Sequence, residues 1–343
     1  MTDYRQDFTD RVIDAIESGN TLPWERPWSA GALMPRNAIS EAEYSGINRL
    51  NLAVAMIDGG YADNRFVTFR QAIDLGGAVR KGEHGHIVER FDVTPFWQRK
   101  DVEVRDGGRP VKVESESGRT AVLQGGKAVE KDSLTVVHDG QSMPWSAARV
   151  LNSGYSKTFV VFNVEQCDGL EKLKPLEPRT EKTTDERFDG IVAGMKKDGL
   201  LVQHTGTEAY YSPRDDRVVV PAARSFATVG DYQSTVLHEI GHATGAEKRL
   251  NRDGITGGHK FGTEGYAKEE LRAELISAFV ALETGISRAR DEQHAAYMQS
   301  WAAILKESKH EIFKAAADAS RAVDYIRERE RTMNVDRKKT IEI

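Results

Sequence analysis

Apolar residues recur at helical spacing near the amino terminus of the chain. Four of them between Phe8 and Ile16 fall on one face of a helix, and the spacing predicts a helix over 4–18. Two further short helices are predicted over 48–57 and 68–75, each followed by a pair of glycines that can end it. The amino-terminal part therefore begins as a helical region.

From residue 78 onward the pattern changes to one typical of strands. Valines and aromatic residues alternate with polar residues and turn glycines as far as residue 164. The stretch 99–155 is rich in Gly, Asp and Ser, and we expect extended hairpins inserted at the surface. The apolar run 158–162 is predicted to be a strand that closes a first domain covering residues 1–168.

The second half of the chain is mostly helical by its spacing. Residues 169–185 hold lysines, prolines and acids with few apolar side chains, which predicts a linker. A second domain is predicted over 186–330, with a hairpin just before a helix at 232–244 and another helix at 268–283. Residues 331–343 are predicted to be a charged tail. The expected fold class is α+β, with a mixed helix and antiparallel-sheet domain followed by a mostly helical one.

Composition excludes several classes of protein. Hydrophobic residues make up 39% and charged residues 29% of the chain, as in soluble globular proteins. No apolar run reaches the ~18 residues of a membrane span, and the amino terminus lacks a signal-peptide pattern. The single cysteine, Cys167, excludes an intramolecular disulfide and a cysteine-based metal cluster. We therefore expect a cytoplasmic protein with no membrane partner. Its net charge of −5 means that any nucleic-acid contact needs a local basic patch.

The strongest chemical signal is the run His-Glu-Ile-Gly-His from His238 to His242. Histidines four apart share one face of a helix and can bind one Zn²⁺ together. A catalytic zinc usually has three protein ligands and a water, and Glu239 is placed to accept a proton from that water. The pattern predicts one metallopeptidase-type zinc site per chain, with another divalent ion as the alternative. A core helix that has this pattern by chance is the competing interpretation.

The third metal ligand is expected from the helix at 268–283. Glu270 and Glu274 are four apart and share a face. We expect Glu270 to be the ligand and Glu274 to orient a histidine, with Glu274 as the alternative ligand. A solvent-exposed acidic face is the other interpretation. His259 and Tyr266, which precede these acids, are candidates to stabilise a tetrahedral oxyanion.

Several short blocks follow one another in order along the chain: Pro23-Trp24, Pro27-Trp28, Pro35-Arg36-Asn37, 44–48, 68–72, 79–83, 161–166, 238–245, 249–252, 266–274 and 296–301. Together these blocks resemble the ArdC-type antirestriction proteins of plasmids and phages. That family joins an amino-terminal domain that binds single-stranded DNA to a zincin-like metallopeptidase domain. The stretch 99–155 departs from the family pattern, because it is longer and more polar, so the resemblance implies no function for it.

The resemblance implies that the protein protects incoming mobile DNA from restriction, with single-stranded DNA as its ligand. Aromatic rings can stack on bases while basic side chains hold phosphates, without reading the sequence. Tryptophans that pack in a core and arginines that merely cover a surface are the alternative interpretation. The candidates for DNA contact are Trp24, Trp28, Tyr44, Asn48, Phe69, Arg36, Arg49, Arg65, Arg70, Arg80 and Lys81.

Three hypotheses for the function follow from these patterns. In the first, the protein is a DNA-binding antirestriction factor with a working peptidase. In the second, it is the same DNA binder and the metal serves structure or regulation only. In the third, it is a peptidase that cleaves a specific host regulatory protein, and its first domain recognises protein. Replacement of Glu239 separates the first from the second, because it removes the base and leaves the predicted metal ligands.

Overall fold

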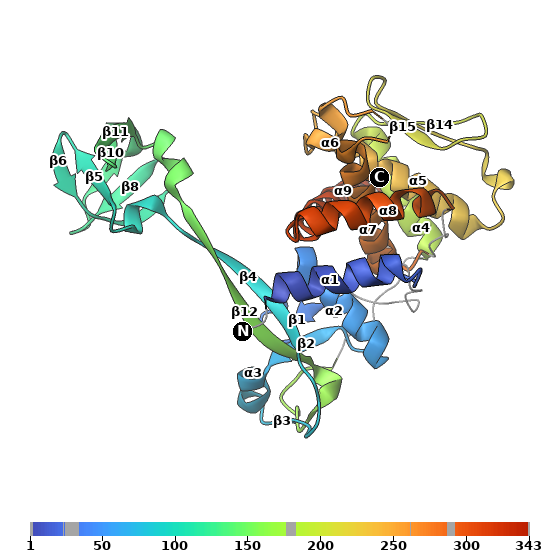
Figure 1. Ribbon diagram of the computed structural model, residues 1–343, viewed down its shortest axis with the longest axis horizontal. Coiled ribbons are helices and arrows are strands. Elements are labelled where there is room, and N and C mark those ends of the chain that lie inside the picture. Colours follow the sequence, from blue (N-terminus) through green and yellow to red (C-terminus); the bar gives the residue numbers. More distant parts are fainter. Residues whose placement is uncertain are drawn as a thin grey trace. The chain divides into compact units, whose positions relative to one another are not determined.

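The computed structural model describes residues 3–22, 24, 34–175, 183–260, 262–286 and 292–341, with only the backbone at 292–296 and 333–341. These residues form two compact units. Unit 1 comprises Met1–Val88 and Val160–Ile343, and unit 2 comprises Glu89–Phe159. The mixture of helices and sheets confirms the predicted α+β class, with a strand-rich region preceding a mostly helical one (Figure 1).

Helices dominate unit 1, and most of those predicted are present with bounds shifted by a few residues. Two helices follow near the carboxyl terminus, and the last of them continues through most of the predicted charged tail at 331–343. The helices are α1 (Tyr4–Glu17), α2 (Gly46–Gly59), α3 (Phe69–Asp74), α4 (Thr184–Lys197), α5 (Val229–Ala243), α6 (Asp253–Thr256), α7 (Glu264–Thr284), α8 (Glu292–Glu307) and α9 (Glu311–Ile341).

Unit 1 also contains three small sheets, and strands β4 and β12 of the first one continue into unit 2. One has the order β1-β2-β12-β4, a second pairs β13 with β3, and a third has the order β14-β16-β15. In the first sheet β1 and β2 are parallel, whereas β12 and β2 are antiparallel. The strands are β1 (Arg36–Asn37), β2 (Arg65–Thr68), β3 (Ala78–Val79), β4 (His86–Thr94), β12 (Ser153–Asn163), β13 (Cys167–Asp168), β14 (Leu201–His204), β15 (Tyr210–Ser212) and β16 (Arg217–Val220).

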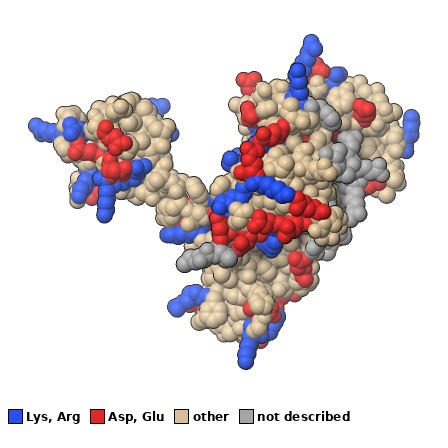
Figure 2. Space-filling view, viewed as in Figure 1, with Lys and Arg blue, Asp and Glu red and all other residues tan. Residues whose placement is uncertain are grey.

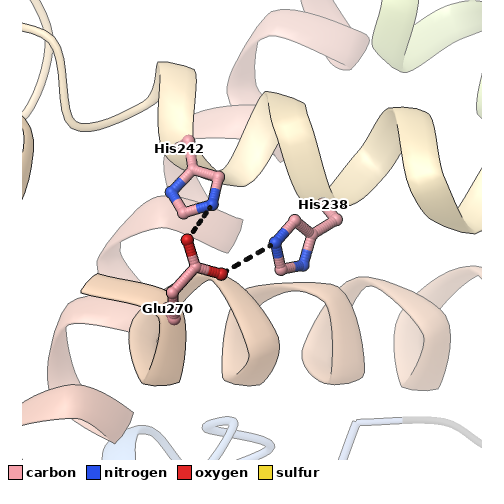
Figure 3. A group of neighbouring side chains, drawn as sticks. All are labelled: His238, His242 and Glu270. Atoms are coloured by element: carbon pink, nitrogen blue, oxygen red, sulfur yellow. Dashed lines mark ion pairs between the residues drawn. The ribbon is translucent and has the colours of Figure 1, made fainter. Parts of the chain in front are cut away.

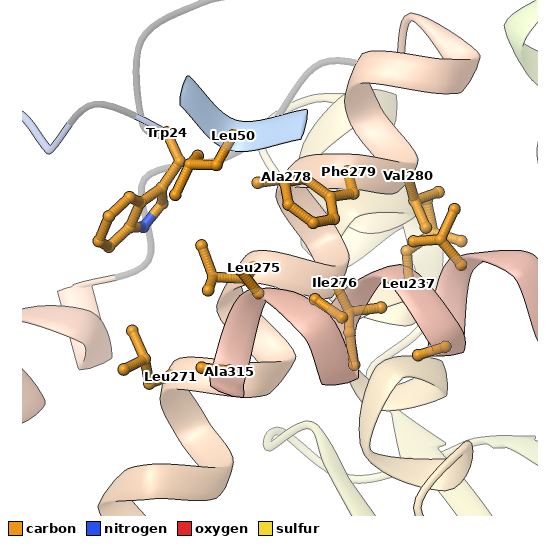
Figure 4. Close-up of a cluster of buried hydrophobic side chains, with 14 of the residues drawn as sticks. Trp24, Leu50, Leu237, Leu271, Leu275, Ile276, Ala278, Phe279, Val280 and Ala315 are labelled. Carbon is orange, nitrogen blue, oxygen red and sulfur yellow. The ribbon is translucent and has the colours of Figure 1, made fainter. Parts of the chain in front are cut away.

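The largest buried hydrophobic cluster described in unit 1 joins the amino-terminal helices to the carboxyl-terminal ones. Side chains of α1 and α2 belong to the same buried cluster as those of α5, α7, α8 and α9. Trp24 lies in this cluster near Leu50, Leu271 and Leu275, and its side chain is fully buried (Figure 4). The two compact units meet at other positions along the chain. The linker at 169–185, of which residues 176–182 lie outside the described part, stays a prediction.

Unit 2 contains the whole of the stretch 99–155, which we predicted as surface hairpins. Its strands form two sheets around a separate core that includes Phe96 and Trp145. The two tryptophans Trp97 and Trp145 stack with ring centroids 5.5 Å apart. The sheet orders are β11-β10-β5-β6 and β7-β8-β9, built from β5 (Val102–Asp106), β6 (Arg109–Val111), β7 (Val113–Ser117), β8 (Thr120–Leu123), β9 (Ala128–Glu130), β10 (Leu134–His138) and β11 (Gln141–Pro144).

Charged side chains of both signs share the surface. On the face seen in Figure 2, Lys and Arg lie next to Asp and Glu in each unit, as the near-neutral composition suggests. Among the residues that the structure describes, no helix combines the length and the apolar character needed to cross a membrane.

Candidate metal centre

Helix α5 presents the two histidines of the motif. Thr228 caps its amino terminus: the Thr228 hydroxyl accepts a hydrogen bond from the Asp231 backbone N–H at 3.1 Å, and the Asp231 carboxylate accepts one from Thr228 N–H. The helix therefore begins at Val229, three residues before the predicted start at 232. Val236, Leu237 and Ile240 bury the opposite side of α5 in the core, which turns His238 and His242 toward α7.

Helix α7 brings Glu270 between the two histidines. The Nε2 atoms of His238 and His242 lie 3.6 and 3.5 Å from the two carboxylate oxygens of Glu270 (Figure 3). The ligand atoms of all three residues lie within 4.8 Å of one another. Gly241 faces α7 at this level, and a side chain there would press on Ile276, so the glycine permits a close approach of the helices.

The spacing of these donor atoms fits a tetrahedral metal ion. Bonds of about 2.0–2.1 Å from a tetrahedral zinc would place neighbouring donors roughly 3.3 Å apart. The observed nitrogen-to-oxygen distances of 3.5 and 3.6 Å are close to this separation. Two imidazole nitrogens and one carboxylate oxygen also form a donor set that suits zinc and similar divalent ions. The residues present therefore fit a mononuclear metal site.

The electrostatics of the site couple the histidines to the acids. Burial would lower the pKa of His238, but the carboxylates of Glu270, Glu239 and Glu274 raise it to about 9. Burial would raise the pKa of Glu270, but His242 and His238 lower it to about 2. Without a metal, the site thus favours protonated histidine beside carboxylate, and a cation that binds there takes the place of the proton.

Glu269, for which the sequence suggested no role, lies against the other nitrogen of His242. Its Oε1 atom is 3.5 Å from His242 Nδ1. Arg252 holds the same carboxylate, with its Nε atom 3.2 Å from both oxygens, and also donates to the Gly241 carbonyl at 2.8 Å. A side chain at Gly245 would collide with the Arg252 guanidinium, so this glycine admits the arginine. The pair links the end of α5 to α7 and orients His242.

Glu274, predicted to orient a histidine or to be an alternative ligand, is fully buried farther along α7. Its negative charge helps to raise the pKa of His238. It is not among the three side chains whose ligand atoms come together, and the carboxylate seen at a histidine Nδ1 belongs to Glu269.

A cavity of about 260 Å³ opens onto the three candidate ligands. Glu239 lines it next to His238. Edge strand β15 forms another wall through Tyr210 and Tyr211, which leaves a strand edge beside the histidines. The cavity therefore combines a metal-binding geometry, a carboxylate and a surface for an extended chain.

Both candidates for oxyanion stabilisation line the same cavity. The Nε2 atom of His259 lies 2.9 Å from the Asp253 carboxylate, and its ring occupies space that side chains at Gly257 and Gly265 would fill. Burial and the neighbouring Glu270 carboxylate raise the pKa of Tyr266, so its hydroxyl stays protonated.

The candidates for DNA contact do not form one surface. Trp24 and Arg49 are buried, and Arg49 lies over the Phe279 ring at 5.4 Å, so both stabilise the core. Tyr44 is half-buried against Phe66. Trp28 lies outside the described residues, and Arg36 and Asn48 are half-buried.

Four of the remaining candidates are exposed to solvent, and Arg65 is half-buried. Phe69 and Arg70 are exposed on α3, and Arg80 and Lys81 are exposed after β3. Arg65 is held by Asp63 at 2.6 Å, whereas Arg80 pairs with Glu83 at 2.7 Å.

Two family models match the chain in order. Residues 2–130 match the N-terminal domain of anti-restriction factor ArdC, and residues 189–318 match a zincin-like metallopeptidase. The second match contains α5 and α7, and the first extends from unit 1 into unit 2.

Relatives are similar to the chain over nearly its whole length. Two proteins named DNA primase TraC from Escherichia coli are 35% and 34% identical over 92% and 94% of this chain. The chain spans only 19% and 27% of the length of those primases. The uncharacterized protein y4eC from Sinorhizobium fredii is 32% identical over 95% of this chain and 92% of its own.

Solved structures are similar over the same length. Crystal structures of the antirestriction protein ArdC from plasmid R388, metal-free and Mn(II)-bound, are 29% identical to this chain with TM-scores of 0.67 and 0.66. Each covers 96% of this chain, and the chain covers 99% and 98% of theirs. With the two ordered family matches and a relative matched over nearly its full length, the chain belongs to the ArdC family of antirestriction proteins.

Proposed function

We propose that this chain protects incoming DNA from host restriction, and that it combines single-stranded-DNA binding with a metal-dependent peptidase site. The observation that carries the peptidase part is the meeting of His238, His242 and Glu270 in a cavity that Glu239 also lines. Membership of the antirestriction family supports the protective role and the DNA ligand.

Zinc is the metal that we propose for the site, one ion per chain, held by His238, His242 and Glu270. The nitrogen-rich donor set favours it, and the Mn(II)-bound structure of the relative supports a site open to other divalent ions. Such an ion, when bound, polarises a peptide carbonyl and makes a nearby water more acidic.

The chain's own residues supply the remaining parts of the reaction. Glu239 accepts the proton of the attacking water and passes it to the leaving amine. Glu269 and Arg252 keep His242 in the orientation that ligation needs. An extended substrate pairs with the edge of β15, which places one peptide bond beside Glu239. His259 and Tyr266, on the same cavity, donate hydrogen bonds to the oxygen of that peptide.

The test uses Glu239→Gln, which removes the base and preserves its size. We expect a metal content equal to that of the natural protein and a fall in peptide cleavage of about 10²–10⁴-fold. Glu247→Gln, an exposed acid just beyond α5, is the matched control and should leave both quantities unchanged. Protection of incoming DNA is then measured in cells that carry a restriction system.

The results of this test separate the three hypotheses. Loss of protection with Glu239→Gln supports a working peptidase. Full protection with Glu239→Gln contradicts the peptidase part of the proposal and leaves the metal a structural or regulatory role. The third hypothesis, a peptidase directed at a host regulatory protein, is favoured by two results together. The natural full-length protein binds no single-stranded DNA, and Glu239→Gln abolishes its protection.

A further inference from the structure

Two neighbouring strands of unit 2 carry exposed aromatic side chains. Among residues 89–159, Phe91 on β4 is 62% exposed, and Tyr155 and Phe159 on β12 are 43% and 38% exposed. β4 and β12 lie side by side and form a two-stranded ribbon here (Figure 1). Large exposed rings grouped on one element are unusual for a surface that binds nothing.

One face of this ribbon combines rings with cations. Side chains alternate between the faces of a strand, so Tyr155, Lys157 and Phe159 share a face. The Lys157 ammonium lies 5.0 Å from the centre of the Tyr155 ring, and the Arg90 guanidinium of β4 lies 5.6 Å from the centre of the Phe159 ring. We call these four residues the aromatic stripe.

The acidic neighbours leave the stripe open to an anion. Asp92 lies on the same face as Arg90, pairs with it at 2.7 Å and also interacts with Lys157, but the Arg90 side chain is 62% exposed and such exposed pairs are weak. Glu89 bonds to Ser156, and both residues alternate onto the opposite face of the ribbon. Phe91 lies on that opposite face too, across Gly154, where a side chain would collide with its ring.

We propose that the aromatic stripe binds single-stranded DNA, an inference that rests on the DNA binding in the proposed function. Tyr155 and Phe159 are four residues apart, about 13 Å along a strand, so each ring can stack on a different base. Lys157 lies between them and Arg90 beside Phe159, where each can contact a phosphate. A paired duplex hides the faces of its bases, so the stripe selects unpaired strands.

The aromatic stripe is accessible to a ligand, whereas several candidates predicted from the sequence are buried. Trp24 and Arg49 are buried in the core of unit 1 and cannot contact a base in this fold. The stripe residues are exposed, and they lie outside the buried cluster of unit 2. Their replacement therefore leaves the core of that unit intact.

The experiment measures binding of the full-length protein to a labelled oligothymidine of about 20 nucleotides by fluorescence anisotropy. We expect the double change Tyr155→Ala and Phe159→Ala to raise the Kd about 30-fold or more, since each lost stack weakens binding severalfold or more. Tyr155→Phe with Phe159→Tyr keeps both rings and should stay within about threefold of the natural protein. Lys157→Gln should reduce the slope of log K against log salt by about 0.7.

Phe91→Ala is the matched control, because it removes a ring that is more exposed than either stripe ring from the opposite face of the same ribbon. The inference is overturned if the natural protein binds but the double alanine variant binds equally well. It is also overturned if duplex DNA competes as well as single strands, or if only Phe69→Ala on α3 weakens binding. Failure of the natural protein to bind at all contradicts the DNA part of the proposed function as well.

Discussion

Replacement of Glu269 by glutamine tests whether the pair of Glu269 and Arg252 orients the metal ligand His242. The change keeps the shape of the side chain and removes its charge. Arg252 Nε lies 3.2 Å from both carboxylate oxygens in a buried setting, where an effective dielectric of about 20 gives an attraction of about 5 kcal/mol. Loss of one partner of such a buried pair destabilises a protein by about 3–5 kcal/mol.

Metal affinity should fall together with stability. A carboxylate that fixes the ring of a ligating histidine typically contributes 10–100-fold to metal affinity, or about 1.4–2.8 kcal/mol. We therefore expect Glu269→Gln to lower the Tm of the metal-free protein and also to raise its Kd for zinc by that factor. The Tm comes from thermal unfolding in a chelator, and the Kd from competition with a chromophoric chelator at a temperature where both proteins are folded.

Glu264→Gln is the control, because Glu264 lies on the exposed first turn of α7 and pairs only with a surface lysine among the described contacts. Glu264→Gln should change neither the Tm of the metal-free protein nor its Kd for zinc appreciably. An unchanged Kd for zinc in Glu269→Gln would refute the reasoning. A larger loss of affinity in Glu274→Gln than in Glu269→Gln would return the orienting role to Glu274, where the sequence had suggested it.

Three further predictions concern the core, acid stability and the metal. Trp24→Ala should lower the free energy of unfolding by about 3–5 kcal/mol in a denaturant titration, and a smaller loss would contradict its place in the core. Burial raises the pKa of Asp216, but Arg249 and Lys248 outweigh burial and lower this pKa to about 2. The ionised carboxylate therefore stabilises the fold above about pH 4, and this stabilisation is lost as the pH falls toward 2. Asp216→Asn should remove roughly 1 kcal/mol of that pH dependence, after allowance for solvent screening. Chelation should lower the Tm of the zinc-loaded protein but not that of a His242→Ala variant.

Local patterns in the sequence predicted the elements that hold the candidate ligands. The four-residue spacings of the histidines and of Glu270 and Glu274 require only helical geometry, so the motif indicated which side chains could meet. The short helices of the amino-terminal region also follow from local spacing and terminal glycines.

The remaining features depend on contacts between distant parts of the chain. An amphipathic face shows that a helix packs, but not against what, so the shared core of α1, α2 and α9 could not be predicted. For the same reason the sequence left open whether Trp24 packs in the core or contacts DNA. The role of Glu269 in orienting His242 depends on Arg252, seventeen positions earlier in the chain. No local pattern in the sequence reveals that Arg252 is buried. The core of unit 2 collects aromatic residues that are far apart in a polar stretch.

The course of the chain into and out of unit 2 has a consequence for how such a protein can change over evolutionary time. The chain leaves along β4 and returns along β12, and these strands are neighbours in one sheet. The whole unit thus takes the place of the short turn that would otherwise join a hairpin. A gene could gain, lose or exchange this segment by a single insertion or deletion and still pair the same two strands. Relatives could therefore differ greatly in length here while keeping the histidines and acids of the metal centre in place.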